Sequence, residues 1–107
     1  MNEVLRKAKQ IIYDEVEHAG YRVCRVILFG SRARREALPD SDWDFYILIT
    51  PTAPSKTRWA IADRICERLA DEGICADVLV QSEETAARRA SNTGYLTYYV
   101  FKEGVEI

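Results

Sequence analysis

The sequence predicts a single domain of the α/β (α+β) class, in which helices and strands alternate in the order αβαβαβα. Two observations support this fold class. Some segments carry apolar residues at helical spacing, and others are short runs of β-branched apolar residues. Since 107 residues is the length of one ordinary domain, we expect residues 1–107 to form one short mixed sheet with helices packed on it.

The first half of the chain predicts a long helix followed by two strands. Apolar residues recur at helical spacing over residues 4–19, and Gly20 follows them like a C-terminal cap. The segments Val23–Phe29 and Asp42–Thr50 are β-branched, apolar runs that favour buried strands. Between the two runs, Gly30 permits a tight turn, and residues 31–37 are expected to form a short helix capped by Ser31.

The second half predicts another long helix, a strand and further helical segments. The long helix begins at Ser55 or Thr57 and ends at Gly73, and Ile74–Gln81 follows it as the third strand. We expect the buried stripe of this long helix to comprise Trp59, Ala62, Ile65, Cys66, Leu69 and Ala70.

The last quarter of the chain is also predicted to be helical. Acidic residues at 83 and 84 suit a helix start, and residues 94–102 have helical spacing again. This last segment carries Tyr95, Leu96, Tyr98, Tyr99 and Phe101. Their spacing favours ordinary core packing, and a surface for a partner is the alternative.

Composition and charge exclude several classes of protein. With a formal net charge of −2, the chain lacks the basic excess of a general nucleic-acid-coating protein, so no direct DNA binding is expected. No apolar run approaches the roughly 20 residues of a membrane span, and the first residues do not resemble a signal peptide. Cys24, Cys66 and Cys75 lie in apolar stretches without paired spacing, which indicates buried free thiols in a cytoplasmic protein.

Three aspartates carry the chemistry that the sequence predicts. Asp42 and Asp44 are two residues apart on an expected strand, so their side chains point the same way with Cα atoms about 7 Å apart. Asp77 is the single acidic residue in the third apolar run, and it would join them if the two strands are neighbours. Oxygen ligands in such a group suit Mg²⁺ or Mn²⁺, and two ions can bind about 3.5–4 Å apart.

The turn before these aspartates has the features of a phosphate site. Gly30 lets the backbone approach a phosphate closely, and Ser31 adds a hydroxyl at a helix start. Arg32, Arg34 and Arg35 add positive charge. Each feature alone is more often structural than functional. Their joint spacing, Gly-Ser followed ten residues later by Asp-x-Asp and then by a lone aspartate within a strand, favours a site that binds metal and triphosphate.

These segments resemble the nucleotidyltransferase superfamily that includes DNA polymerase β. The motifs are "FGSRAR" at Phe29–Arg34 and "PDSDWDF" at Pro39–Phe45, with support from "ADVLV" at Ala76–Val80 and "EGVEI" at the C-terminus. Within that superfamily they are most similar to the minimal nucleotidyltransferases, the MntA-like antitoxins of HEPN–MNT toxin–antitoxin pairs.

The resemblance implies Mg²⁺-dependent transfer of AMP from ATP to a tyrosine hydroxyl of a partner HEPN ribonuclease. By motif match, Gly30 and Ser31 would hold the nucleotide phosphates, with Arg32 and Arg34 beside them. Asp42 and Asp44 would bind metal, and Asp77 would complete the metal site and help to deprotonate the acceptor.

The chain departs from the family pattern at Arg35, where glycine is common, and at Trp43 and Phe45, which are bulkier than the usual aliphatic residues. Two other functions remain open. The chain could neutralise a partner by contact alone, or it could modify a small molecule such as an aminoglycoside. The short chain argues against the small-molecule acceptor, since larger relatives use extra helical domains to hold it.

Overall fold

The computed structural model describes residues 2–107 and contains helices on both faces of a four-stranded sheet. This arrangement confirms the predicted α+β class. The elements are α1 (Glu3–His18), β1 (Arg22–Phe29), β2 (Trp43–Thr50), α2 (Ser55–Asp71), β3 (Ala76–Ser82), α3 (Glu83–Arg89), α4 (Leu96–Glu103) and β4 (Val105–Glu106).

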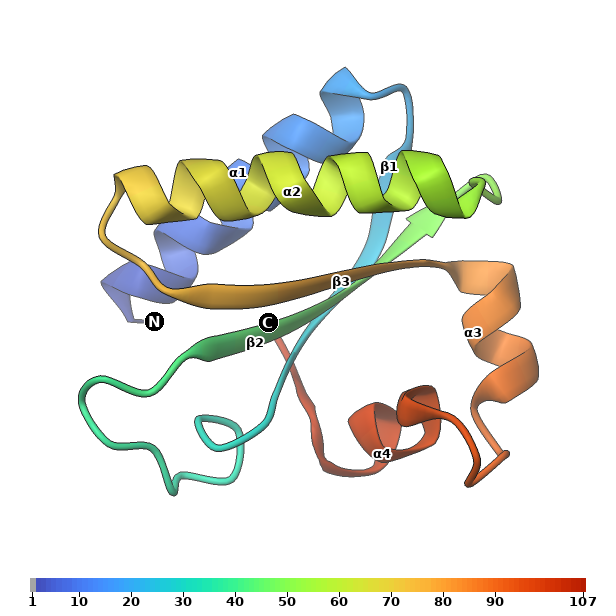
Figure 1. Ribbon diagram of the computed structural model, residues 1–107. Helices are drawn as coiled ribbons and strands as arrows, with labels where there is room; N and C mark the ends of the chain where they lie inside the picture. Colours follow the sequence, from blue (N-terminus) through green and yellow to red (C-terminus); the bar gives the residue numbers. More distant parts are fainter. Residues whose placement is uncertain (1) are drawn as a thin grey trace.

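The sheet has the strand order β3-β2-β1-β4 and is mixed, as predicted. Strand β1 pairs antiparallel with β2 and β4, whereas β2 and β3 are parallel. A parallel pair needs a crossover connection, which α2 supplies. Figure 1 shows α1 and α2 on one face of the sheet and α3 and α4 on the other.

The main hydrophobic core lies between the sheet and the pair α1 and α2. Alternate residues of β2 and both helices contribute fully buried side chains to it, including Ile12, Val16, Phe45, Ile47, Ile65 and Leu69. A smaller cluster on the opposite face joins β1 and β2 to α3 and α4, and includes Ile27, Leu48, Ala86 and Val100. Because side chains alternate along a strand, β2 supplies both clusters.

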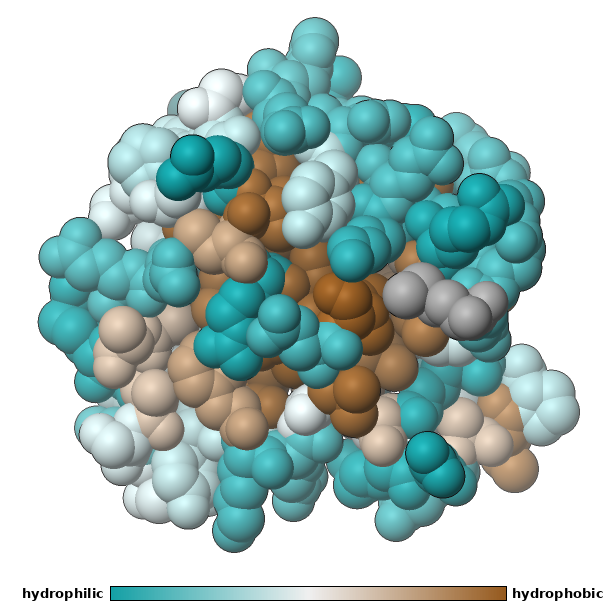
Figure 2. Space-filling view, turned by 180° about the vertical axis from the view of Figure 1, so that it is seen from behind, coloured by the Kyte–Doolittle hydropathy of each residue, from teal (hydrophilic) through white to brown (hydrophobic). Residues whose placement is uncertain are grey.

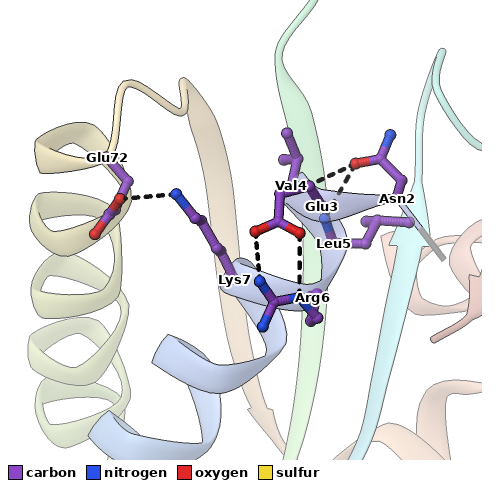
Figure 3. A network of polar contacts seen from close by, with 7 residues as sticks. All are labelled: Asn2, Glu3, Val4, Leu5, Arg6, Lys7 and Glu72. Carbon is purple, nitrogen blue, oxygen red and sulfur yellow. Dashed lines mark hydrogen bonds and ion pairs between the residues drawn. The ribbon is translucent and has the colours of Figure 1, made fainter.

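Polar contacts hold the start of α1 (Figure 3). The Asn2 side-chain oxygen accepts hydrogen bonds from the backbone N–H groups of Val4 and Leu5, at 2.7 and 3.4 Å, and so caps the helix. Glu3 pairs with an arginine one turn later, and the Lys7 ammonium lies 3.3 Å from a Glu72 carboxylate oxygen just beyond α2. The Lys7 contact links the two helices at the edge of the core.

The prediction of a helix over residues 31–37 is wrong. The chain makes a single irregular turn there, in which the Arg34 N–H donates to the Gly30 carbonyl at 3.2 Å. Arg35 has φ 60° in the left-handed region, which ends the turn before a helix can propagate. Ser31 therefore caps no helix, and the element order is αββαβααβ.

Four smaller expectations also need correction. Trp59 and Ala70 are exposed, and the buried stripe of α2 is Ile61, Ile65 and Leu69. Cys75 is exposed, whereas Cys24 and Cys66 are half-buried. Strand β4 was not predicted, because two residues are too short for a period-2 pattern. In α4 the buried residues are Thr97 and Val100, and Tyr95, Leu96 and Tyr99 are exposed.

The side of the molecule that is turned away in Figure 1 has one apolar area. Figure 2 shows apolar residues gathered in the middle of that side and hydrophilic residues around them. None of the helices within residues 2–107 is long and apolar enough to cross a membrane.

Candidate active site

The register of the two parallel strands brings Asp44 and Asp77 side by side. Asp44 of β2 is the direct partner of Asp77 of β3, and residues in register on neighbouring strands point to the same face. Asp42 lies in the loop, one residue before β2 begins, and it is exposed. The structure thus places two of the three predicted aspartates on adjacent strands and the third beside them, on the face of the sheet toward α4.

Burial and like charges make the Asp44 carboxyl unusual. Its pKa is raised, first because burial disfavours the charged form and then because the carboxylates of Asp77 and Asp42 are close. The positive charge of Arg34 opposes this shift. Asp44 is therefore close enough to the other two aspartates and to Arg34 to feel their charges.

Gly30 lies directly against the Asp44 carboxylate. A Cβ atom added to Gly30 would lie 2.1 Å from Asp44 Oδ2, closer than any real contact. Gly30 also has φ +75°, which side chains rarely tolerate. Only glycine therefore allows the backbone of the turn to approach Asp44 this closely, and the binding of a phosphate by this turn stays a prediction.

The arginines of the turn have different surroundings. Arg34 lies near Asp44, and its Nε is 3.1 Å from a Glu36 carboxylate oxygen. The Arg32 guanidinium instead stacks 4.0 Å above the Trp43 ring and donates to the Ser41 carbonyl at 2.7 Å. Arg32 thereby holds the loop before β2, and Arg34 is the arginine of this turn whose positive charge acts on Asp44.

A cavity of about 230 Å³ adjoins the turn on the side of α4. It is lined by Phe29, Gly30, Arg34, Leu96, Tyr99, Val100 and Glu103. Sequence reasoning did not place the α4 residues here. The one signal for them was the alternative that the aromatic residues within 94–102 form a surface for a partner. Contact between α4 and the turn depends on tertiary packing, which the sequence pattern does not report.

The donor set fits a hard divalent cation. All three aspartates offer oxygen ligands, and their mutual repulsion is what a bound cation would relieve. Within residues 2–107, no group of three or more acidic, histidine or cysteine side chains is already arranged to hold an ion. The predicted metal site is therefore a neighbourhood of carboxylates that would have to converge on binding.

Comparison with known proteins identifies the family. Residues 16–107 match the family described as Polymerase beta, Nucleotidyltransferase. A comparison with curated protein sequences finds no significant match.

Solved structures share the fold. A structure of the toxin–antitoxin MntA–HpeT, in a variant with two aspartates changed to glutamate, has 18% identity and a TM-score of 0.61, covering 99% of this chain and 71% of that one. A toxin–antitoxin with AMP-PNP has 18% identity and a TM-score of 0.59, covering 92% and 70%.

A third structure is the tri-AMPylated Shewanella oneidensis HEPN toxin in complex with its MNT antitoxin. It has 20% identity and a TM-score of 0.56, covering 94% of this chain and 66% of that one. At such identities these structures show a shared fold. The match over residues 16–107, which span the glycine turn and all three aspartates, shows that the chain belongs to the polymerase β nucleotidyltransferase family.

Proposed function

We propose that this nucleotidyltransferase is a Mg²⁺-dependent protein adenylyltransferase that transfers AMP from ATP to a tyrosine hydroxyl of a HEPN-type toxin. The proposal goes beyond family membership in its donor, its acceptor and its metal. Its support is the fold shared with three solved structures: the toxin–antitoxin MntA–HpeT, a toxin–antitoxin with AMP-PNP, and an AMPylated HEPN toxin in complex with an MNT antitoxin. The free cysteines agree with a reducing, cytoplasmic location.

One observation carries the chemistry. The Gly30 backbone touches the Asp44 carboxylate, which is itself in register with Asp77. A phosphate held by the turn would therefore lie next to a group of carboxylates, as transfer at phosphorus requires. Neither feature alone has this meaning, because glycine turns and surface aspartates are common.

Each residue of the site has a distinct role in this proposal. The backbone N–H groups at Gly30 and Ser31 bind phosphate oxygens, and Arg34 offsets their charge. The adjoining cavity is smaller than the ~300–1,000 Å³ pockets that enclose drug-sized ligands, so it suits one part of a nucleotide. Asp42, Asp44 and Asp77 would hold Mg²⁺ or Mn²⁺, two ions in all, and the ions supply positive charge that stabilises the transferring phosphoryl group.

Asp77, which is exposed on the edge strand β3, accepts the proton of the acceptor phenol. The phenol oxygen forms a bond to the α-phosphorus, and the bond from that phosphorus to the bridging oxygen breaks. Pyrophosphate leaves with the electron pair. A phenol, with pKa about 10, gives up its proton more readily than an aliphatic hydroxyl, which suits a single carboxylate base.

The decisive experiment incubates the purified protein with the candidate toxin, Mg²⁺ and ATP labelled at the α-phosphate. Label should appear on a toxin tyrosine with the wild type and vanish with Asp77→Ala. Asp71→Ala is the matched control, because Asp71 is an exposed aspartate at the end of α2, away from the β2 and β3 register pair.

Neutralisation by contact alone predicts another result. Under that alternative, Asp77→Ala would protect cells as well as the wild type does, and neither protein would transfer label. Label on an added aminoglycoside, with none on protein, would instead support the small-molecule alternative.

A further inference from the structure

A groove crosses the edge of the sheet at β3 and lies next to the aspartates. Its volume is about 260 Å³, and α2, β3 and the start of α4 form its walls. Four large hydrophobic residues in its lining are exposed to solvent: Trp59 (67%), Leu79 (41%), Tyr95 (41%) and Leu96 (50%). Such a group of apolar side chains around a hollow is typical of a surface that binds a partner.

The charge of the groove has one sign. Its charged lining residues are Arg58 and Arg89, and no acidic residue lines it in the described part of the chain. The Arg89 guanidinium stacks 4.4 Å above the Tyr95 ring, and both arginines are close enough to Tyr46 to act on its pKa, which burial nonetheless raises. The groove therefore combines apolar anchors with two positive charges, and its complement is apolar and acidic.

The position of the groove relates it to the acceptor. Leu79 follows Asp77 by two residues on β3, so both side chains point to the same face, about 6.6 Å apart along the strand. Arg58 donates to the Val80 carbonyl at 3.2 Å, which occupies the outer edge of β3 at that point. An occupant would therefore be recognised by its side chains rather than by adding a strand.

We propose that this groove binds the segment of the acceptor protein that flanks its tyrosine, and that it selects segments with apolar and acidic residues next to that tyrosine. This inference rests on the proposed function. A segment whose apolar side chain contacts Leu79 and Trp59 brings a tyrosine two or three residues away to Asp77. Acidic residues of the segment pair with Arg58 and Arg89.

A protein segment suits the groove better than nucleic acid. Aromatic and arginine side chains can also bind single-stranded nucleic acid by stacking. Here, however, Leu79, Leu96, Val78 and Val80 form much of the lining, and the chain has a net charge of −2. Aliphatic walls match apolar side chains, and only two arginines would neutralise a phosphate backbone.

Synthetic peptides test the groove without ATP or turnover. The probe is a short peptide with one tyrosine, two leucines and three glutamates, and its control has lysine in place of each glutamate. Binding is measured through tryptophan fluorescence, because Trp59 lies in the groove. The glutamate peptide should bind at least about tenfold more tightly than the lysine peptide. Trp59→Phe should remove the fluorescence change.

A charge reversal gives the sharper result. Arg89→Glu should reverse the preference, so that the lysine peptide binds more tightly than the glutamate peptide. Arg88→Glu is the matched control, since Arg88 is the neighbouring residue, does not line the groove and pairs with Glu84. It should leave the preference unchanged. Leu79→Ser should weaken the glutamate peptide while the protein remains folded.

Two outcomes would overturn the inference. One is equal binding of the two peptides with no effect of Arg89→Glu, and the other is tighter binding of a single-stranded oligonucleotide than of the glutamate peptide. Since the peptides report binding alone, failure here would leave AMP transfer to the toxin intact. Loss of label transfer with normal peptide selection would instead contradict the proposed function.

Discussion

The two faces of the sheet differ in how completely they are covered. On the face toward α1 and α2, alternate residues of β2 such as Phe45, Ile47 and Ile49 are fully buried in a continuous core. On the other face, the same strand begins with Asp44, continues with Tyr46 and Leu48, and is covered by two short helices.

The difference shows how one strand serves stability and chemistry together. Side chains alternate, so the half of β2 that faces α1 and α2 is anchored in the core and holds Asp44 in place on the other face. On the partly covered face, Tyr46 is buried and shares a 2.6 Å hydrogen bond with the Thr97 hydroxyl, which ties α4 to the sheet. Toward the start of the strand the cover ends, and the aspartates meet the Gly30 turn.

The largest effect should come from the closed face. Phe45→Ala removes a fully buried ring, so it should reduce the free energy of unfolding by about 3–5 kcal/mol. Leu79→Ala, on the partly covered face, should cost less than about 1 kcal/mol because the side chain is already exposed. Urea denaturation of both variants checks the contrast. Equal losses would mean that the two faces do not differ as described.

The next effect separates backbone strain from contact with the site. Gly20 and Gly30 both have positive φ, but an added Cβ at Gly20 has nothing within 4 Å. Gly20→Ala should therefore cost only the strain, about 1–2 kcal/mol. Gly30→Ala should cost more in urea denaturation and should also weaken ATP binding in calorimetry, because the Cβ displaces the Asp44 carboxylate. If both variants bind ATP like the wild type, the contact between turn and carboxylate has no role in binding.

A smaller effect is expected at Arg35, which has φ 60°. Arg35→Gly should raise the free energy of unfolding by roughly 0.5–1 kcal/mol, since glycine adopts this conformation without steric cost. Thermal unfolding of this variant measures the effect. Ala37→Gly is the control, and it should destabilise the protein slightly in the same assay.

The smallest effect is a difference in pH dependence between two carboxyl groups. The pKa of Asp44 is raised, so ionised Asp44 disfavours folding, and stability is lost as pH rises through its folded-state pKa. Burial alone would raise the pKa of Glu15, but hydrogen bonds from Arg68 and Arg64 outweigh it and lower that pKa. The stability that Glu15 contributes is therefore present above its unfolded-state pKa and is lost on acidification.

Urea titrations between pH 3 and pH 7, values that bracket ordinary carboxyl titration, compare these two groups. Asp44→Asn should gain stability over the wild type as pH rises, whereas Glu15→Gln should lose stability over the same range. A decrease for Asp44→Asn at neutral pH would show that its charge is compensated in the folded protein and would contradict the shared negative environment.

Most of the fold followed from local patterns. The helical spacing of residues 4–19 and the β-branched runs 23–29, 42–50 and 74–81 correspond to α1, β1, β2 and β3 within a few residues. These elements are predictable because the period of the apolar residues reports directly on which face is buried. A helix was expected over residues 31–37 because Ser31 with several good helix formers resembles a helix start. It does not form because the backbone at Arg35 is left-handed.

The candidate site was predicted less completely. From the sequence, Asp77 joins Asp44 only if their two strands are neighbours, and the parallel register of β2 and β3 meets that condition. The different surroundings of Arg32 and Arg34 could not, because adjacent arginines in a turn look alike until Trp43 and Ser41 are placed. The roles of the aspartates and of the turn in binding metal and nucleotide stay predictions that the experiments above test.

By itself the sequence determined the long helices and the three longer strands, the residue types at the start of β2, and the family that the motifs indicate. These properties depend on neighbours in the chain and on the period of its apolar residues. Only the tertiary structure decided that Gly30 touches Asp44, that Trp59 and Tyr99 are exposed, and that Leu79 and Leu96 line one groove. Such contacts join residues far apart in the chain, and their geometry is set by how helices pack on the sheet rather than by any local pattern.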